Sequence, residues 1–124
     1  MKLNPDCVRD ILLVVENSSD FNNPTDSHDF IKLENKYSTG EILYHIRQVD
    51  MAGLTVGTQF FMGGGFMIKD LSPAGHKFLS DIRNDDNWNK TKSIAQKIGS
   101  FSIDALASIA SGVTTAAINK FFNQ

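Results

Sequence analysis

The segment from Tyr37 to Leu54 constrains the fold most, because a helix start, an apolar stripe and a helix stop follow one another in it. Ser38 and Glu41 have the spacing of a capping box, in which each side chain bonds a backbone N–H at the helix start. Apolar residues then recur at helical spacing: Ile42, Ile46 and Val49, with Leu43 beside them. Gly53 stands where a left-handed residue ends a helix, so this segment is predicted to be an amphipathic helix.

A β-hairpin is predicted directly after this helix. Alternate residues of the first strand are expected to share one face and to meet two residues of the return strand: Leu54, Val56, Thr58 and Phe60, opposite Phe66 and Ile68. Gly63, Gly64 and Gly65 are expected to form the tip, where a positive φ has no steric cost. This order is typical of a recognition helix followed by a wing: a helix that ends at a glycine, a strand, a glycine-rich turn and a second strand.

The predicted fold is therefore α+β, mainly α, with a winged helix-turn-helix-like core, a β-hairpin wing and C-terminal helices. Residues 5–17 read as a first helix capped by Asn4, residues 18–29 as a surface loop, and residues 30–33 as a short strand. Only residues 34–36 then precede the central helix, where a winged helix has a full helix. The alternative is an unrelated helix that leads into a hairpin.

Three further helices are predicted after the hairpin, beginning with one that Ser72 caps and Pro73 opens. The second covers residues 88–97 and the third about 102–122. The third repeats apolar residues in steps of three and four, as in a helix-packing seam: Ile103, Leu106, Ala110, Val113, Ala117 and Phe121. We expect homodimerisation through this seam, with packing inside the chain as the alternative. Residues 1–84 would form the winged-helix-like domain and residues 85–124 a helical extension within the same compact unit.

The charge balance argues against tight electrostatic binding to duplex DNA. The 124 residues carry a formal net charge of −2. Residues 1–37 hold four basic and seven acidic groups, and residues 38–97 hold seven basic and six acidic groups. A protein that neutralises many phosphates usually shows a basic stripe, and no segment here is strongly basic.

No catalytic or metal-binding motif is recognisable, so we expect a protein that is not an enzyme and has no cofactor. His28, His45, His76 and Cys7 lack the spacing of metal ligands. Cys7 lies in the first turn of a predicted helix, where the helix dipole would lower its pKa somewhat, but a structural thiol is the expected role.

The expected location is the cytoplasm. The lone cysteine excludes an internal disulfide, and no apolar run follows Lys2 to form a signal peptide. Asp104 and Gly112 interrupt the run of apolar residues in the last predicted helix, so no membrane span is expected.

Several segments together resemble an uncharacterised family of short proteins from bacteria, phages and prophages: MKLNPDCVRDILLVVE, YHIRQVDMAGL, DLSPAGHKFL and WNKTKSIAQKIGSFSIDAL. The resemblance covers nearly the whole chain. It implies a winged-helix-like core and a source in a mobile element, and it carries over no activity, cofactor or catalytic residue.

The first functional hypothesis is a small dimeric winged-helix protein that binds duplex DNA, as a phage transcription regulator would. Four side chains of the central helix would face the major groove: Tyr44, His45, Arg47 and Gln48. Four lysines would contact phosphates: Lys69, Lys77, Lys90 and Lys92.

The second hypothesis is a winged helix that binds a protein, for example a phage-encoded, anti-CRISPR-like inhibitor of a host defence protein or of a host transcription protein. The acidic balance and a wing without Arg or Lys at its tip motivate this reading. The anchors would be the apolar residues that flank the glycine tip: Phe61, Met62, Phe66 and Met67.

Overall fold

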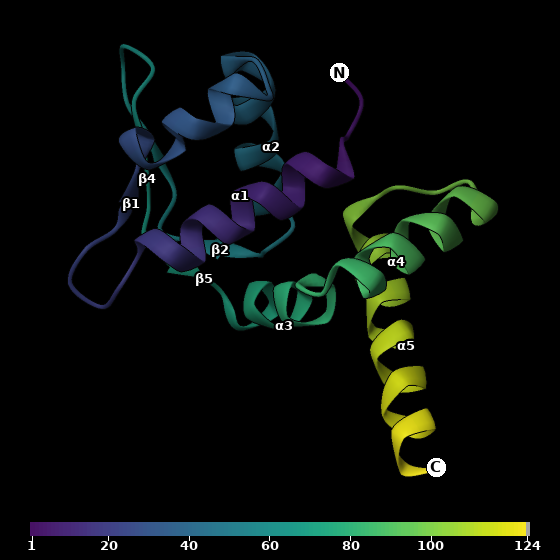
Figure 1. The fold of residues 1–124 in the computed structure, drawn as a ribbon. Coiled ribbons are helices and arrows are strands. Elements are labelled where there is room, and N and C mark those ends of the chain that lie inside the picture. The colour runs from purple at the N-terminus through teal and green to yellow at the C-terminus, as the bar shows by residue number, and fades with distance from the viewer. Residues whose placement is uncertain (124) are drawn as a thin grey trace. The chain divides into compact units, whose positions relative to one another are not determined.

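The fold is mainly helical α+β. A computed structural model describes residues 1–123, which contain five α-helices, one 3₁₀ helix and five short strands in two antiparallel sheets (Figure 1). The chain separates into two compact units, residues 1–76 and the residues from 77 onward. These are called the N-terminal unit and the C-terminal unit below. The division at residue 84 that the sequence suggests stays a prediction.

Helix α1 (Pro5–Ser18) begins as predicted. The Asn4 side chain accepts hydrogen bonds from the backbone N–H groups of Asp6 (3.0 Å) and Cys7 (3.4 Å), and Pro5 takes the first helical position. One face of the helix is buried: Cys7, Val8, Ile11, Leu12 and Val15. Helix α1 contacts α2, β1, β5 and the 3₁₀ helix, so it lies at the centre of the N-terminal unit.

The predicted strand at residues 30–33 is wrong, because the 3₁₀ helix η1 (Ser27–Asn35) occupies this place. It follows the two-residue strand β1 (Thr25–Asp26). Asp26 and Asp29 form a reciprocal capping box, with N···O distances of 2.9 Å to the N–H groups of His28 and Asp26. Phe30 is buried while its neighbour Ile31 is exposed. A helical element therefore does stand between the first strand and the central helix.

The central helix α2 (Thr39–Met51) is confirmed with both of its end signals. Ser38 and Glu41 form the capping box, with N···O distances of 3.1 Å in both directions. Gly53 has φ of 78°, and the Leu54 N–H donates to the Val49 carbonyl at 2.9 Å. Helix α2 packs against α1.

The hairpin is present, but it is divided into two short ladders. Strand β2 (Thr55–Val56) pairs with β5 (Asp70–Leu71), and β3 (Gln59–Phe60) pairs with β4 (Phe66–Ile68). Strand β4 also pairs with β1, which gives a three-stranded sheet in the order β1-β4-β3.

The predicted common face of the first strand is wrong, because Leu54 is buried whereas Val56 and Phe60 are exposed. The chain turns at Gly57, which has φ of 64° and lies against Lys69. At the tip, Gly63 and Gly64 have φ of 93° and 95°, in agreement with the prediction. The Phe61 N–H closes the turn by donating to the Gly65 carbonyl at 2.8 Å.

Helix α3 (Pro73–Ile82) starts at the predicted cap. The Ser72 hydroxyl accepts the Gly75 N–H at 3.0 Å and donates to the Gly53 carbonyl, while the Ser72 N–H donates to the Leu54 carbonyl. These bonds attach the start of α3 to the chain that leaves α2.

The C-terminal unit contains a helical hairpin of α4 (Asp85–Ile98) and α5 (Ile103–Phe122), which pack against each other (Figure 1). Asn84 caps α4, Ser102 caps α5, and Gly99 ends α4 with φ of 84°. No helix within residues 1–123 is long and apolar enough to cross a bilayer.

Candidate functional site

The exposed side of α2 and the hairpin form one continuous candidate surface in the N-terminal unit. Arg47 is exposed on α2, and its guanidinium carbon lies 5.3 Å from the centroid of the Phe60 ring on β3. A guanidinium over an aromatic face is an attractive cation–π contact. This contact joins the helix face to the hairpin. Tyr44 and Gln48 are half-buried beside it.

His45 does not belong to this surface, so its predicted role in the major groove is wrong. The side chain is fully buried. Its Nε2 accepts the Asn4 backbone N–H at 2.8 Å, and its Nδ1 lies 2.7 Å from the Glu41 carbonyl oxygen, which can only accept. Both ring nitrogens are therefore used: the Nδ1 bond lies within α2, and the Nε2 bond holds the start of α1 against α2.

The four predicted wing anchors divide into three groups. Met62 is fully exposed and Phe61 is 47% exposed, so both are free to contact a partner. Met67 is half-buried. Phe66 is wrong as an anchor, because it is buried edge-on against Phe30 with ring centroids 5.0 Å apart.

The predicted phosphate-binding lysines are distributed over both units. Lys69 is exposed in the N-terminal unit, where its side-chain stem lies against Gly57. The other three belong to the C-terminal unit. There Lys77 pairs with Asp81 at 3.0 Å, and Lys92 lies 5.4 Å from the centroid of the Trp88 ring. In the N-terminal unit, α2 and the hairpin therefore supply only Arg47 and Lys69 as cations.

The two units carry charges of opposite sign. Residues 1–76 hold six basic and ten acidic side chains, a net charge of −4 with neutral histidines. Residues 77–124 hold six basic and four acidic side chains, a net charge of +2. No Lys or Arg stands between Gly57 and Ile68. The hairpin tip is thus an uncharged apolar feature on an acidic unit.

Half of the predicted dimerisation seam is buried within the chain. Leu106 and Ala110 are fully buried, and Ile103 is nearly so, because the turn at Gly99 folds α5 back onto α4. These three residues are wrong as dimer contacts, and packing inside the chain is what they provide. Val113 is half-buried, whereas Ala117 and Phe121 are exposed.

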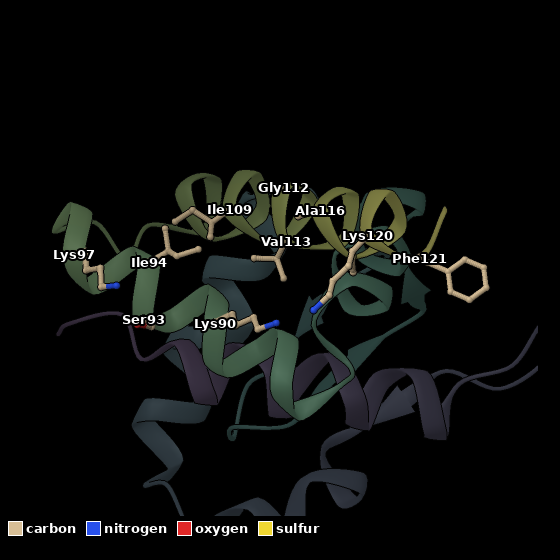
Figure 2. Close-up of a pocket in the computed structure, with 11 residues that line it drawn as sticks. Lys90, Ser93, Ile94, Lys97, Ile109, Gly112, Val113, Ala116, Lys120 and Phe121 are labelled. Atoms are coloured by element: carbon tan, nitrogen blue, oxygen red, sulfur yellow. The ribbon is translucent and has the colours of Figure 1, made fainter. Parts of the chain in front are cut away.

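A groove of about 800 Å³ runs along one side of the α4–α5 hairpin (Figure 2). Ile94 from α4 and Ile109 and Val113 from α5 point into it, and Lys90, Lys97 and Lys120 lie at its margins. Among its lining residues, Lys90 was predicted to contact phosphates, and three were predicted as dimer contacts: Val113, Ala117 and Phe121. The groove itself was not predicted. The available signal was the helical spacing of Lys90, Ile94 and Lys97 on one side of α4.

The described residues contain no group of three or more His, Cys, Asp or Glu side chains that could hold a metal ion. Cys7 is fully buried, and burial together with the charges of Asp10 and Glu41 raises the pKa of its thiol to about 12. The predicted lowering by the helix dipole is therefore wrong, and Cys7 is a structural thiol. Burial and the hydrogen bond to Asp10 (2.7 Å) likewise raise the pKa of Tyr37.

Comparison with known proteins places this chain in a family. The sequence model described as hypothetical protein (DUF2513) matches residues 2–102. The chain belongs to the DUF2513 family. An uncharacterized protein of Haemophilus influenzae strain Rd is 29% identical over 113 residues, which cover 89% of this chain and 92% of the relative.

The predicted resemblance to an uncharacterised family is thus confirmed, while a phage or prophage source stays a prediction. No solved structure matches this DUF2513 protein. Helix α5 lies beyond the residues that the family model matches.

Proposed function

We propose that the N-terminal unit is a non-enzymatic binding module of the winged-helix type, whose recognition helix is α2 and whose wing is the β3–β4 hairpin. The element order supports this assignment: a helix, a short strand, a second helical element, α2 and then the hairpin. The strand order β1-β4-β3 supports it as well, because the last strand of the wing lies between the other two.

The proposed ligand of this module is a protein. An acidic unit repels a phosphate backbone, and this unit has a net charge of −4. The hairpin tip carries no cation that could enter a minor groove, and it exposes Phe61 and Met62 instead. Large apolar side chains at an exposed turn suit the centre of a protein interface.

Arg47 and Phe60 extend this surface from the hairpin tip to α2. Aromatic residues and arginine are enriched among the residues that dominate interface energies. Their mutual contact at 5.3 Å restricts the conformations of the long Arg47 side chain before a partner binds. Less conformational entropy is then lost on binding.

The single observation that carries the proposal is the exposure of Phe61 and Met62 on a tip without cations. If the protein comes from a phage or prophage, a host defence or transcription protein is the fitting class of partner, and the module acts as its inhibitor.

The test is affinity capture with the tagged full-length chain from a lysate of the organism that encodes it. We expect a specific partner that the Phe61→Ser/Met62→Ser variant loses. Ile98→Ser is the matched control, because Ile98 is an exposed apolar residue on α4 and belongs neither to α2 nor to the hairpin. A partner that the double variant retains would show that the hairpin tip is not the site.

Duplex DNA is the second candidate, and the exposed Arg47 with Tyr44 and Gln48 beside it on α2 favours it. Arginine and glutamine can pair bidentately with guanine and adenine in the major groove. A mobility-shift assay at low salt with the DNA upstream of its own gene tests this candidate. Absence of a shift at micromolar protein removes this candidate.

A further inference from the structure

The α4–α5 groove is a second binding surface, and it belongs entirely to the C-terminal unit. Its floor is aliphatic and lies between two helices (Figure 2). Gly112 and Ala116 add no bulky side chain to the α5 wall. Small residues allow the backbone of an incoming segment to approach closely. The volume of about 800 Å³ is large enough for the apolar side chains of a short segment.

The margins of the groove carry positive charge only. Lys90 and Lys97 lie on the α4 side and Lys120 on the α5 side, and none of the lining residues is acidic. In Figure 2 the Lys90 and Lys120 amino groups extend into the opening from opposite walls. An occupant must therefore combine an apolar stripe with flanking negative charge.

The spacing of the lysines selects the shape of that occupant. Lys90 and Lys97 are seven residues apart on one helix, which places them two turns or about 10.5 Å apart along the axis. Ile94 lies between them in the floor. A helix with carboxylates at intervals of seven residues presents the same spacing, with its apolar residues on the face between them.

Other occupants fit these features less well. A symmetric dimer would bring each patch against its own copy and would place the lysines of both chains together. A fatty acid offers one carboxylate to three separated cations. A membrane surface is flat, whereas this site is concave with a floor of small and branched aliphatic residues.

We propose that the α4–α5 groove binds an acidic amphipathic helix of another protein, with the apolar stripe of that helix on Ile94, Ile109 and Val113 and its carboxylates on Lys90, Lys97 and Lys120. This is helix-in-groove recognition, with charge complementarity setting the register. The site is separate from the proposed surface on α2 and the hairpin.

The test uses the full-length chain and a fluorescent peptide of about three heptads, with leucine at two positions of each heptad and glutamate at one flanking position of each. A second peptide has lysine in place of every glutamate. We expect the acidic peptide to bind the native chain and the basic peptide not to bind, as measured by fluorescence anisotropy.

Charge reversal in the groove should exchange this preference. Lys90→Glu/Lys97→Glu should weaken binding of the acidic peptide about tenfold or more and should create binding of the basic peptide. Circular dichroism of the variant checks that it is folded when it gains the basic peptide. Lys92→Glu is the matched control on the same helix, because Lys92 lies over Trp88 and not in the groove, and it should change either affinity by less than about twofold.

Three results would overturn the proposal. The first is failure of the acidic peptide to bind the native chain. The second is an equal loss in the groove variant and in the Lys92→Glu control. The third is a chain that does not bind the peptide but either dimerises in sedimentation or co-sediments with phosphatidylglycerol vesicles, in a way that depends on Lys90 and Lys97. A second copy of the chain or a lipid surface would then be the occupant of the groove.

Discussion

Asp10 on α1 is the residue that joins the first helix to the start of the central one. Its carboxylate accepts from the Tyr37 hydroxyl at 2.7 Å and pairs with Lys36 at 3.0 Å. Tyr37 is buried next to the Ser38 cap, and Cys7 lies one turn before Asp10 on α1. A negative carboxylate thus stands beside two buried groups that become negative when they lose a proton.

We predict that alkaline pH destabilises the protein through Cys7. Burial and the nearby carboxylates raise the pKa of its thiol from 9.0 to about 12, so the folded state favours the neutral form. The stabilisation is complete below the pKa of an unfolded cysteine and is lost as the pH rises through about 12. At about pH 10.5 the loss should be about 2 kcal/mol relative to neutral pH.

Urea unfolding of the native chain and of Cys7→Ala at about pH 8 and pH 10.5 measures this loss. The native chain should lose more free energy of unfolding than the variant, whose remaining loss reports Tyr37. An equal loss in both proteins would show that the thiol stays neutral in the unfolded chain or ionises freely in the folded one. In the folded protein at neutral pH, Cys7 should also resist thiol reagents.

His45→Ala should destabilise the protein by about 2–3 kcal/mol, because the Asn4 N–H then loses its partner and a buried ring leaves a cavity. His28→Ala is the control, since His28 is exposed on η1 and should cost less than about 0.5 kcal/mol. Denaturant midpoints of the two variants measure the difference. A stable His45→Ala variant would mean that the ring does not link α1 to α2.

The burial of His45 could have been predicted from its position. It stands three residues after Ile42 and four before Val49, inside the apolar stripe. Its polar ring suggested a surface role, because the partner that satisfies it, the Asn4 backbone, is distant in sequence. Residue type alone could not distinguish an exposed ligand-binding histidine from a buried one with two hydrogen bonds.

At the scale of elements, the junction between α2 and α3 depends on a glycine. A Cβ at Gly75 would lie 2.0 Å from the Leu54 carbonyl oxygen, a backbone atom that cannot move away alone. Gly75→Ala should therefore destabilise the protein by about 2 kcal/mol or more, through overpacking at the start of α3. Thermal unfolding followed by circular dichroism measures the effect.

Gly40→Ala provides the comparison, because Gly40 lies in the first turn of α2 and a Cβ there meets nothing within 4 Å. Alanine is the better helix former, so this variant should be as stable as the native chain or slightly more stable. A Gly75→Ala variant that matched it would contradict the close approach of α3 to Leu54.

Helix ends were predictable where their chemistry is local. The caps at Asn4, Ser38, Ser72 and Ser102 all formed, because each needs only a side chain and the N–H groups that follow it. The prediction of a strand at residues 30–33 was wrong. Four residues are too few to distinguish the two-residue period of a strand from the three-residue period of a 3₁₀ helix. The capping box of Asp26 and Asp29 was the signal that would have corrected it.

The break in the hairpin and the burial of α5 depend on contacts that are not local. Strand β2 begins at Thr55 and not at Leu54, so Thr55 faces inward and Val56 outward, and Gly57 then separates β2 from β3. The apolar seam of α5 correctly predicted that this helix packs against another helix. A seam does not say, however, whether that helix is α4 or belongs to a second chain. For the same reason, the α4–α5 groove could not be found from either helix alone.

For the molecule as a whole, the opposite net charges of the two units determine where a polyanion such as DNA can bind. The N-terminal unit has a net charge of −4 and the C-terminal unit +2. Three lysines lie at the margins of the groove in the C-terminal unit, whereas the tip of the hairpin has no cation. Weak contact with DNA would therefore use the lysines of α4 and α5, even though α2 is the recognition helix of the proposed fold.

The salt dependence of DNA binding separates this weak contact from specific recognition. We predict a slope of log affinity against log salt concentration of about −2 to −4, because each phosphate contact contributes about −0.9. Lys90→Glu/Lys97→Glu should flatten the slope by about two, while Arg47→Ala should leave it nearly unchanged. Anisotropy titrations of a labelled duplex between about 50 and 200 mM salt measure both. The opposite outcome is a slope steeper than about −6 that the lysine substitutions leave unchanged and that Arg47→Ala makes shallower. That result would assign DNA binding to α2. The ligand of the N-terminal unit would then be duplex DNA and not a protein.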